Sequence, residues 1–413
     1  MLYLRQTYDF GKHDSILIND STVNHLFYPK LRLAHTLSYN RQTNYYRGSN
    51  QDSNYYIQNY GVNILYKRYD EFNLNDDWQN VTNDFSIYQY PDTKNQLQYI
   101  TAGISAEVWR GRFTQATIKD TSKNFVNVLV HGQYRNTTKN KKWDIDAEAV
   151  LHLSGYNAAD YSLNASLIRN TTTALGNIEL YARQVNRTPS FIYYGQSAVS
   201  AFTLNGIKKE NITELKAAVS NPKKEQYLSA QLITANNLLT WQGFNKYRQE
   251  GLFNLLQITA SKRLKVYKKI YLHTDAIIQQ VLIGAPKINI AKFYLRNRIG
   301  YEGNLGKKNL RLATGLEIRY LAPYKLDAFS PITSQFYYQD SASSSTNLPD
   351  VTAYLHFNIT KFTAMIRVEN IQTVRYVQGE NGGIKFMNNN YAATHYLNPG
   401  LVFRFGVFWK FIN

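Results

Sequence analysis

Apolar and polar side chains alternate residue by residue in many segments of this chain. In 401–411 the odd positions carry large apolar side chains, while the even positions include Arg404. The segment 143–153 repeats the pattern, with Asp144 and Asp146 in the polar phase. Successive side chains of a strand point to opposite faces, so a period of two predicts strands with one apolar and one polar face. A slip of one residue would carry these carboxylates into the apolar face, so the register is well determined.

This alternation predicts about seventeen strands, most of them near the length that crosses a bilayer when tilted, roughly 9–11 residues. The predicted spans are 1–10, 28–47, 81–90, 97–110, 125–136, 142–153, 159–169, 177–187, 211–219, 226–234, 252–264, 270–281, 291–304, 310–320, 351–359, 361–369 and 400–412. No stretch approaches the roughly 18 consecutive apolar residues of a membrane helix, so spanning helices are excluded. The mean hydropathy of −0.44 still allows a membrane barrel, because only every second strand residue meets lipid.

The connections between these strands carry a second signal, because they alternate between short and long. Short ones, such as 306–309 and 137–141, are rich in Lys, Asn, Gly and Thr, as tight turns require. Long ones, such as 321–350 and 370–399, contain polar runs. Two connections break the rule: 154–158 is a short member of the long set, and 11–27 is a long member of the short set.

Outer-membrane barrels have short periplasmic turns on one side and longer extracellular loops on the other. We therefore expect an all-β fold: one antiparallel transmembrane β-barrel of about 16–18 strands, formed by 1–413 as a single domain. The alternative is a buried β-sandwich, which is disfavoured because a sandwich of this size needs a repeated unit and none is visible. An odd strand count and a start, MLYLRQTYDF, that does not resemble a signal peptide predict that N-terminal strands and a signal peptide are missing.

The polar phase of the predicted strands holds many charged side chains, which we expect to line a pore. These candidate pore-lining residues are Lys292, Arg296, Arg298, Arg311, Arg319, Arg367, Arg404, Lys410, Glu302, Glu317, Glu369, Asp144, Asp146 and Glu148. Basic C-terminal strands facing an acidic strand near residue 146 would create a transverse field across the lumen, as rings of charge do in other pores. The alternative is that these charges pair locally across neighbouring strands. The formal net charge of +18 favours a mild preference for anions.

No arrangement of residues predicts catalysis, a metal site or a cofactor. The histidines lack the helical i, i+4 spacing of zinc sites, and there is no Gly-x-Ser-x-Gly elbow and no phosphate-binding glycine motif. His35 falls in the apolar phase of its strand, which predicts a position facing lipid or the membrane interface. The basic residues are spread along the chain rather than clustered, which argues against nucleic-acid binding. With no cysteine, a disulfide framework is impossible.

Two segments of the sequence resemble a known family. They are LYLRQTYDFGKHDSILINDSTV with the following FYPKLRLAHTLSY, and the closing GLVFRFGVFWKFIN. Both are similar to the putative porin family of the Bacteroidetes. The resemblance implies an outer-membrane, porin-like β-barrel, with no defined catalytic residues and no established substrate. The terminal aromatic Phe411 also resembles the C-terminal signal that barrel-assembly machinery recognises, although it lies two residues from the end.

We therefore expect a passive diffusion channel for small polar or anionic solutes in the bacterial outer membrane, and not an enzyme. Its expected partners are outer-membrane lipid, lipopolysaccharide and the barrel-assembly machinery, while association into homo-oligomers stays open. Two alternatives differ in class. One is a barrel with a filled lumen that serves as an interaction or secretion-complex component, and the other is a TonB-dependent uptake barrel without a plug.

Overall fold

The structure is a computed structural model, and it describes most of the chain. The described residues are 1–19, 22–49, 54, 57–58, 71–114, 120–173, 175–190, 206–243, 247–306, 310–331, 334–340, 348–379 and 382–411. Among them, no helix is both long and apolar enough to cross a membrane.

Seventeen strands form one antiparallel sheet, because the alternating segments predicted from the sequence pair with one another along their whole length. They are β1 (Leu2–Asn19), β2 (Thr22–Ser49), β3 (Glu71–Gln89), β4 (Gln98–Thr114), β5 (Asp120–Thr137), β6 (Trp143–Ser154), β7 (Tyr161–Arg169), β8 (Asn177–Arg187), β9 (Glu210–Asn221), β10 (Gln226–Asn236), β13 (Phe253–Tyr267), β14 (Ile270–Ile283), β15 (Phe293–Asn304), β16 (Leu310–Leu321), β19 (Asp350–Ile359), β20 (Phe362–Glu369) and β25 (Val402–Trp409).

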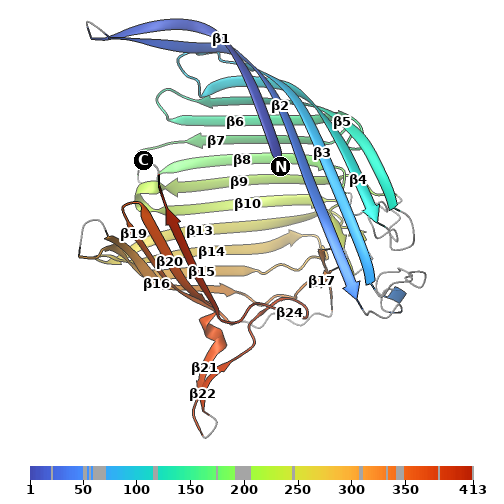
Figure 1. The fold of residues 1–413 in the computed structure, drawn as a ribbon, viewed down its shortest axis with the longest axis vertical. Helices are drawn as coiled ribbons and strands as arrows, with labels where there is room; N and C mark the ends of the chain where they lie inside the picture. Colours follow the sequence, from blue (N-terminus) through green and yellow to red (C-terminus); the bar gives the residue numbers. More distant parts are fainter. Residues whose placement is uncertain are drawn as a thin grey trace.

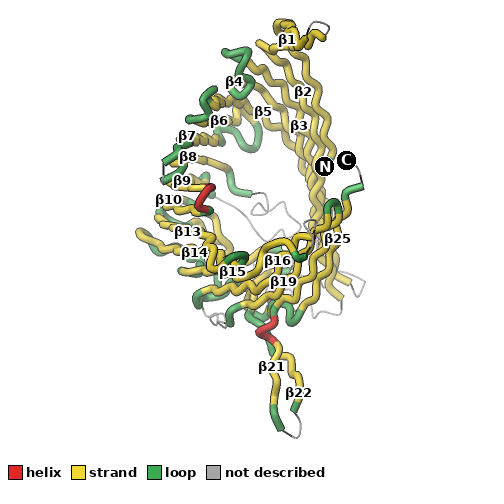
Figure 2. The backbone as a smooth tube through the Cα atoms, turned by 90° about the vertical axis from the view of Figure 1, so that its left-hand side faces the viewer, coloured by secondary structure: helices red, strands yellow, loops and turns green. Residues whose placement is uncertain are grey.

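Each of these strands pairs with the next one along the chain, so the sheet is a simple meander (Figure 1). The sheet curls round into a barrel that brings the first and last strands to the same side (Figure 2). Within the described residues, β1 and β25 are the two edges of the sheet and are not paired with each other.

All seventeen predicted strands are present, and the predicted all-β, antiparallel barrel is confirmed. The predicted ends of several strands are wrong. The segment 11–27 is not a loop, because β1 and β2 pair as far as Asn19 and Thr22, which returns this connection to the short set. Likewise β3 begins at Glu71 rather than at 81, and β4 extends to Thr114.

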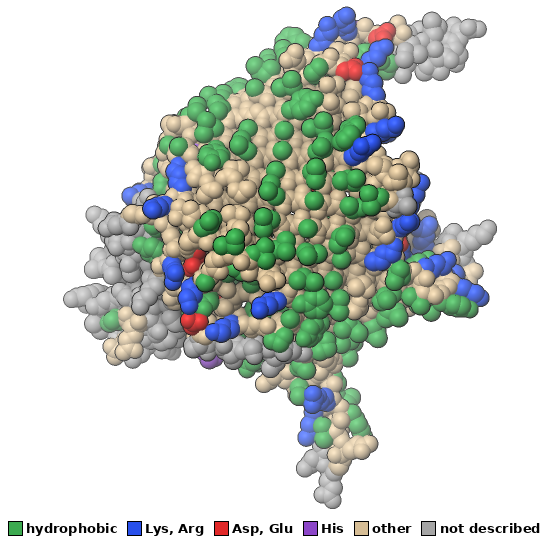
Figure 3. Space-filling view, turned by 180° about the vertical axis from the view of Figure 1, so that it is seen from behind, with side chains coloured by type: hydrophobic (Ala, Val, Ile, Leu, Met, Phe, Trp, Pro, Cys, Tyr) green, Lys and Arg blue, Asp and Glu red, His purple; other side chains and the backbone are tan. Residues whose placement is uncertain are grey.

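The two faces of the sheet differ as the alternation predicts. Large apolar side chains stand exposed on the outer face; Phe403 and Phe405 of β25 are each 71% exposed. Figure 3 shows apolar side chains spread over one side of this outer face, with Lys and Arg mostly toward its margins. Exposed apolar surface of this extent suits contact with lipid rather than water. His35 also lies on this face, where its ring stacks on Phe85 at 4.4 Å between centroids.

The long connections contain short hairpins of their own. They are β11 (Leu239–Trp241) with β12 (Tyr247–Gln249), β17 (Ala328–Ser330) with β18 (Gln335–Tyr337), β21 (Val374–Val377) with β22 (Gly383–Phe386), and β23 (Tyr391–Ala393) with β24 (Tyr396–Leu397). The β21–β22 hairpin projects away from the sheet (Figure 1). The other hairpins and the segments beside them bury apolar side chains, including Trp241 of β11 and Leu326, which comes just before β17 and is 1% exposed. The long loops therefore form a small core of their own.

Candidate functional site: the charged inner wall

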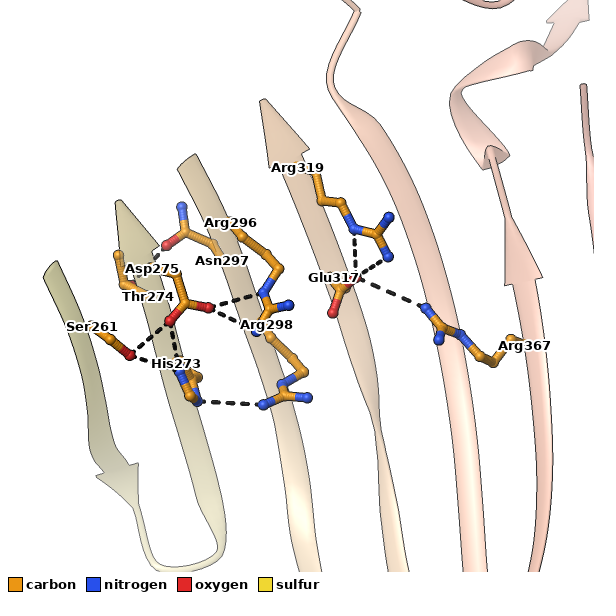
Figure 4. A network of polar contacts seen from close by, with 10 residues as sticks. All are labelled: Ser261, His273, Thr274, Asp275, Arg296, Asn297, Arg298, Glu317, Arg319 and Arg367. Carbon is orange, nitrogen blue, oxygen red and sulfur yellow. Dashed lines mark hydrogen bonds and ion pairs between the residues drawn. The ribbon is translucent and has the colours of Figure 1, made fainter. Parts of the chain in front are cut away.

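The polar face of the C-terminal half of the barrel carries two neighbouring clusters of charged side chains, one around Asp275 and one around Glu317 (Figure 4). The clusters lie on β13, β14, β15, β16 and β20, and β14, β15 and β16 each contribute two residues that are two positions apart. We call this set the basic wall, and its members are Ser261, His273, Asp275, Arg296, Arg298, Glu317, Arg319 and Arg367.

Asp275 organises the first half of the basic wall. Its carboxylate accepts a hydrogen bond from the Ser261 hydroxyl at 2.7 Å and forms an ion pair with Arg296 at 2.8 Å. His273 lies on the same strand, with its Nε2 3.1 Å from Asp275 Oδ1. Arg298 reaches the other ring nitrogen, Nδ1, at 3.3 Å. All five polar side chains are thus held by neighbours within the wall.

Glu317 organises the second half. Its side chain is only 8% exposed, and it forms an ion pair with Arg319 at 2.5 Å. Arg367 approaches the same carboxylate from β20 at 3.8 Å. The network continues to the last strand, because Glu369 pairs with both Arg367 at 3.5 Å and Arg404 at 2.8 Å.

The strand register explains why the acids are needed. Arg296 lies directly opposite Arg319 in the β15–β16 ladder, and like charges in that position repel. Asp275 and Glu317 each neutralise one of this pair. Together with Glu369 and Arg404, the wall holds five arginines and three carboxylates, so it keeps an excess of positive charge. An excess of fixed positive charge attracts anions.

The serine, histidine and aspartate of the basic wall do not have the geometry of a nucleophilic triad. In such a triad the acid holds Nδ1 of the histidine while Nε2 takes the serine proton. Here Asp275 bonds Nε2, and Nδ1 faces the Arg298 guanidinium. Among the described residues, no group of three or more His, Cys, Asp or Glu side chains is placed to hold a metal ion.

The remaining charged residues that the sequence predicted on the C-terminal strands lie toward the strand ends. Lys292 comes directly before β15, and Lys410 directly after β25. Glu302 forms an ion pair with Arg263 at 2.6 Å. Arg311 lines a separate cavity of about 460 Å³ near the same end of the sheet.

Arg263 belongs to this set although the sequence analysis did not single it out. Its guanidinium pairs with Glu225 at 2.8 Å as well as with Glu302, and it lies 4.0 Å from the centre of the Tyr271 ring. It shares the polar phase of its strand with Ser261, which is the signal that could have found it.

The acidic residues of β6 pair locally. Arg135 of β5 contacts Asp146 at 2.7 Å and Asp144 at 3.4 Å. Glu148 lies beside a cavity of about 490 Å³ that Arg135 and Arg183 also line. This geometry is the local pairing that the sequence left open as the alternative to a transverse field.

A further polar cluster on β3, β4 and β5 was not foreseen. The Asp84 carboxylate accepts hydrogen bonds from the hydroxyls of Ser86, at 2.6 Å, and Ser105, and lies 2.6 Å from His131 Nε2. A Cβ on Gly103 would lie 2.4 Å from the His131 ring, so glycine is required for His131 to reach Asp84. In the sequence, Asp84 and Ser86 lie on one predicted strand, while Ser105 and His131 lie on two others. Only the pairing register of these three strands brings the four side chains together.

The fold and the two-faced sheet define a class: a transmembrane β-barrel of the outer-membrane type. A family model described as "Putative porin" matches residues 1–413. The chain belongs to this putative porin family, as the resemblance of its two ends predicted. No curated protein matches the chain in sequence.

Solved structures share the fold at very low sequence identity. The ferric enterobactin receptor of Pseudomonas aeruginosa (a mutant form) aligns with a TM-score of 0.62 and 10% identity, over 99% of this chain and 62% of the receptor. A siderophore receptor of Acinetobacter baumannii aligns with a TM-score of 0.55 and 8% identity, over 99% and 62%. The ferric preacinetobactin receptor of the same species gives 0.53 and 9%, over 98% and 62%. The chain thus spans less than two thirds of these receptors.

Proposed function

We propose that this protein is a passive channel of the bacterial outer membrane that passes small polar solutes and prefers anions. The observation that carries the proposal is the basic wall with its extension to β25, in which five arginines (Arg296, Arg298, Arg319, Arg367 and Arg404) face only three carboxylates (Asp275, Glu317 and Glu369). Fixed charge of one sign along a wet path raises the local concentration of mobile ions of the other sign. Catalysis plays no part in this proposal.

Reconstitution into planar lipid bilayers tests the proposal. We expect discrete conductance steps, and in a KCl gradient a reversal potential on the anion-selective side. The double substitution Arg296→Gln with Arg298→Gln should move that potential toward zero, because it removes two fixed positive charges. Lys385→Gln is the matched control, since Lys385 lies on the projecting β22 and should leave the potential unchanged. Cation selectivity of the wild-type channel would contradict the proposal.

One observation favours a second candidate function, a barrel with a filled lumen whose loops bind a partner. The long loops build a core of their own, in which Leu326, Trp241 and Ala393 are buried. Structured loops suit recognition of another molecule better than open diffusion. A correctly folded protein that inserts into bilayers and never conducts would favour this candidate over the channel.

A further inference from the structure

A cavity of about 650 Å³ lies at the long-loop end of the barrel, away from the basic wall. Its lining comes from strands far apart in the sheet: β2, β3 and β4 on one side, and the end of β8, the start of β9 and β11 on the other. Gln335 of the β17–β18 hairpin completes it, and the neighbouring Ser334 donates a hydrogen bond to Asn44 of β2 at 3.1 Å. We call this cavity the vestibule.

Aromatic rings form one side of the vestibule. Trp78 and Trp109 both line it, with their ring centres 6.4 Å apart in an edge-to-face arrangement. Trp109 stacks on Phe125 at 5.9 Å, and Phe125 contacts Tyr156, a third lining ring, at 5.2 Å. Edge-to-face and stacked contacts hold such rings in fixed orientations. The vestibule therefore offers preformed aromatic surface.

The backbone is adapted to this cluster at Gly111. A Cβ at this position would lie 2.9 Å from the Trp78 ring and 2.7 Å from the Phe113 ring. Any larger residue would push Trp78 out of its place across β4. Because residue 111 is glycine, the Trp78 ring can pack directly on the backbone of β4.

Amide side chains lie beside these rings on the same wall, and Gln42 of β2 is directly paired with Trp78 in the strand ladder. Asn40, Gln42 and Asn44 stand two residues apart on β2, so all three present their side chains to the same face. Asn80 of β3 lies across from Asn40 in the strand ladder. Each amide both donates and accepts hydrogen bonds through planar groups.

Among the described residues, the charged ones that line the vestibule are Asp76, Arg187 and Glu210, so the only positive charge among them is paired with a carboxylate. Arg187 donates to the buried Glu210 at 2.7 Å, and the same carboxylate accepts from the backbone N–H of Leu239 at 2.9 Å. Asn157 is fixed through its side chain, which donates to Asp160 at 2.8 Å. A net anion-binding charge is therefore lacking here, in contrast to the basic wall.

We propose that the vestibule binds carbohydrate, as a short neutral oligosaccharide. A sugar ring has an apolar face of C–H groups that packs on an aromatic ring, and a rim of hydroxyls that both donate and accept hydrogen bonds. Tryptophan rings beside a row of amides match both features at once, and neither an anion nor a purely apolar ligand would use both. The volume lies in the range of ligand pockets, roughly 300–1,000 Å³. This inference does not depend on conduction by the channel.

Binding can be measured by intrinsic tryptophan fluorescence, since the chain has only five tryptophans and two of them line the vestibule. The protein is kept in a detergent without a sugar head group and titrated with maltotriose, cellotriose and chitotriose. At least one should give saturable binding. Trp109→Ala should weaken it by about tenfold, while Trp109→Phe should keep most of the affinity because a stacking face remains.

Trp143→Phe is the matched control, because Trp143 stands on β6 among the residues of the lipid-facing phase and outside the vestibule. It should leave sugar affinity unchanged. Asn44→Leu tests the row of amides and should also weaken binding, since it removes both a donor and an acceptor. Folding of each variant is checked by the heat-dependent shift in gel mobility of intact barrels. The proposal is overturned if no trisaccharide binds, if Trp109→Ala binds as well as wild type while folded, or if an aromatic catecholate binds more tightly than every sugar.

Discussion

At the scale of single residues, the inner surface depends on a few carboxylates that each hold more than one guanidinium. Glu317 is the clearest case, because it is nearly buried and serves both Arg319 and Arg367. Its place in the polar phase was visible in the sequence. Its partners were not, because Arg367 lies two strands away and only the register brings it near.

Glu317→Ala should destabilise the barrel by about 1–3 kcal/mol, since two guanidinium groups lose their shared acceptor in a poorly solvated place. Glu302→Ala is the control. Its carboxylate is 41% exposed, and loss of such an ion pair should cost under about 1 kcal/mol. Urea unfolding followed by gel mobility measures both. Equal effects of the two substitutions would contradict the role assigned to Glu317.

Gly315 tests how closely β15 and β16 approach each other. A Cβ there would lie 2.1 Å from the carbonyl oxygen of Ile299, so Gly315→Ala must shift the backbone and should cost about 1–3 kcal/mol. At Gly132 the nearest atom to an added Cβ is 3.3 Å away, so Gly132→Ala should cost clearly less. The same urea assay measures the loss of stability in both variants. A larger loss in Gly132→Ala than in Gly315→Ala would contradict the close approach of β15 and β16.

At the scale of elements, the sequence predicted every strand of the sheet but not where the longest ones end. Apolar and polar residues alternate along a strand because one of its faces contacts lipid, so the alternation ends where the strand leaves the bilayer. Backbone hydrogen bonding between the strands continues beyond that point. The segment 71–80 shows this, since it pairs with β2 and β4 yet has no apolar period. The hairpins in the long loops were missed for the same reason.

Asp340 links two of these loops. Its side chain accepts hydrogen bonds from Tyr338 at 2.6 Å and pairs with Lys287 at 3.2 Å and Lys325 at 3.3 Å. The hydrogen bonds from Tyr338, Lys287 and Lys325 lower the pKa of Asp340 from 3.8 to about 2. Because this pKa lies below its ordinary value, the link is complete at pH 4 and above and is lost as the pH falls through about 2.

Asp340→Asn should therefore loosen the loops at neutral pH. We expect trypsin to cleave faster after Lys287 and Lys325, because neither ammonium group keeps its carboxylate partner. Lys385, on the projecting hairpin, provides the internal control and should be cut at the same rate in both proteins. Unchanged cleavage at Lys287 and Lys325 would show that other contacts hold these loops together.

At the scale of the whole molecule, one alternation separates an apolar exterior from a charged interior around the barrel. The sequence could predict which residues of a strand share a face, because odd-numbered and even-numbered positions point to opposite faces. It could not predict whether acids and bases confront each other across the lumen or pair locally. Arg135 with Asp144 and Asp146 shows local pairing on one side, and Arg296 with Asp275 shows it on the other. The vestibule lay beyond prediction because it joins strands from opposite walls.

The most direct test of this two-faced barrel uses the absence of cysteine in the chain. Single cysteines are placed in turn at 295 to 299 along β15, and the protein is reconstituted in lipid vesicles. We predict that a charged, water-soluble thiol reagent labels Arg296→Cys and Arg298→Cys, while Leu295→Cys, Asn297→Cys and Ile299→Cys react only with a lipid-soluble reagent. Labelling by the water-soluble reagent that fails to alternate along the strand would contradict the account.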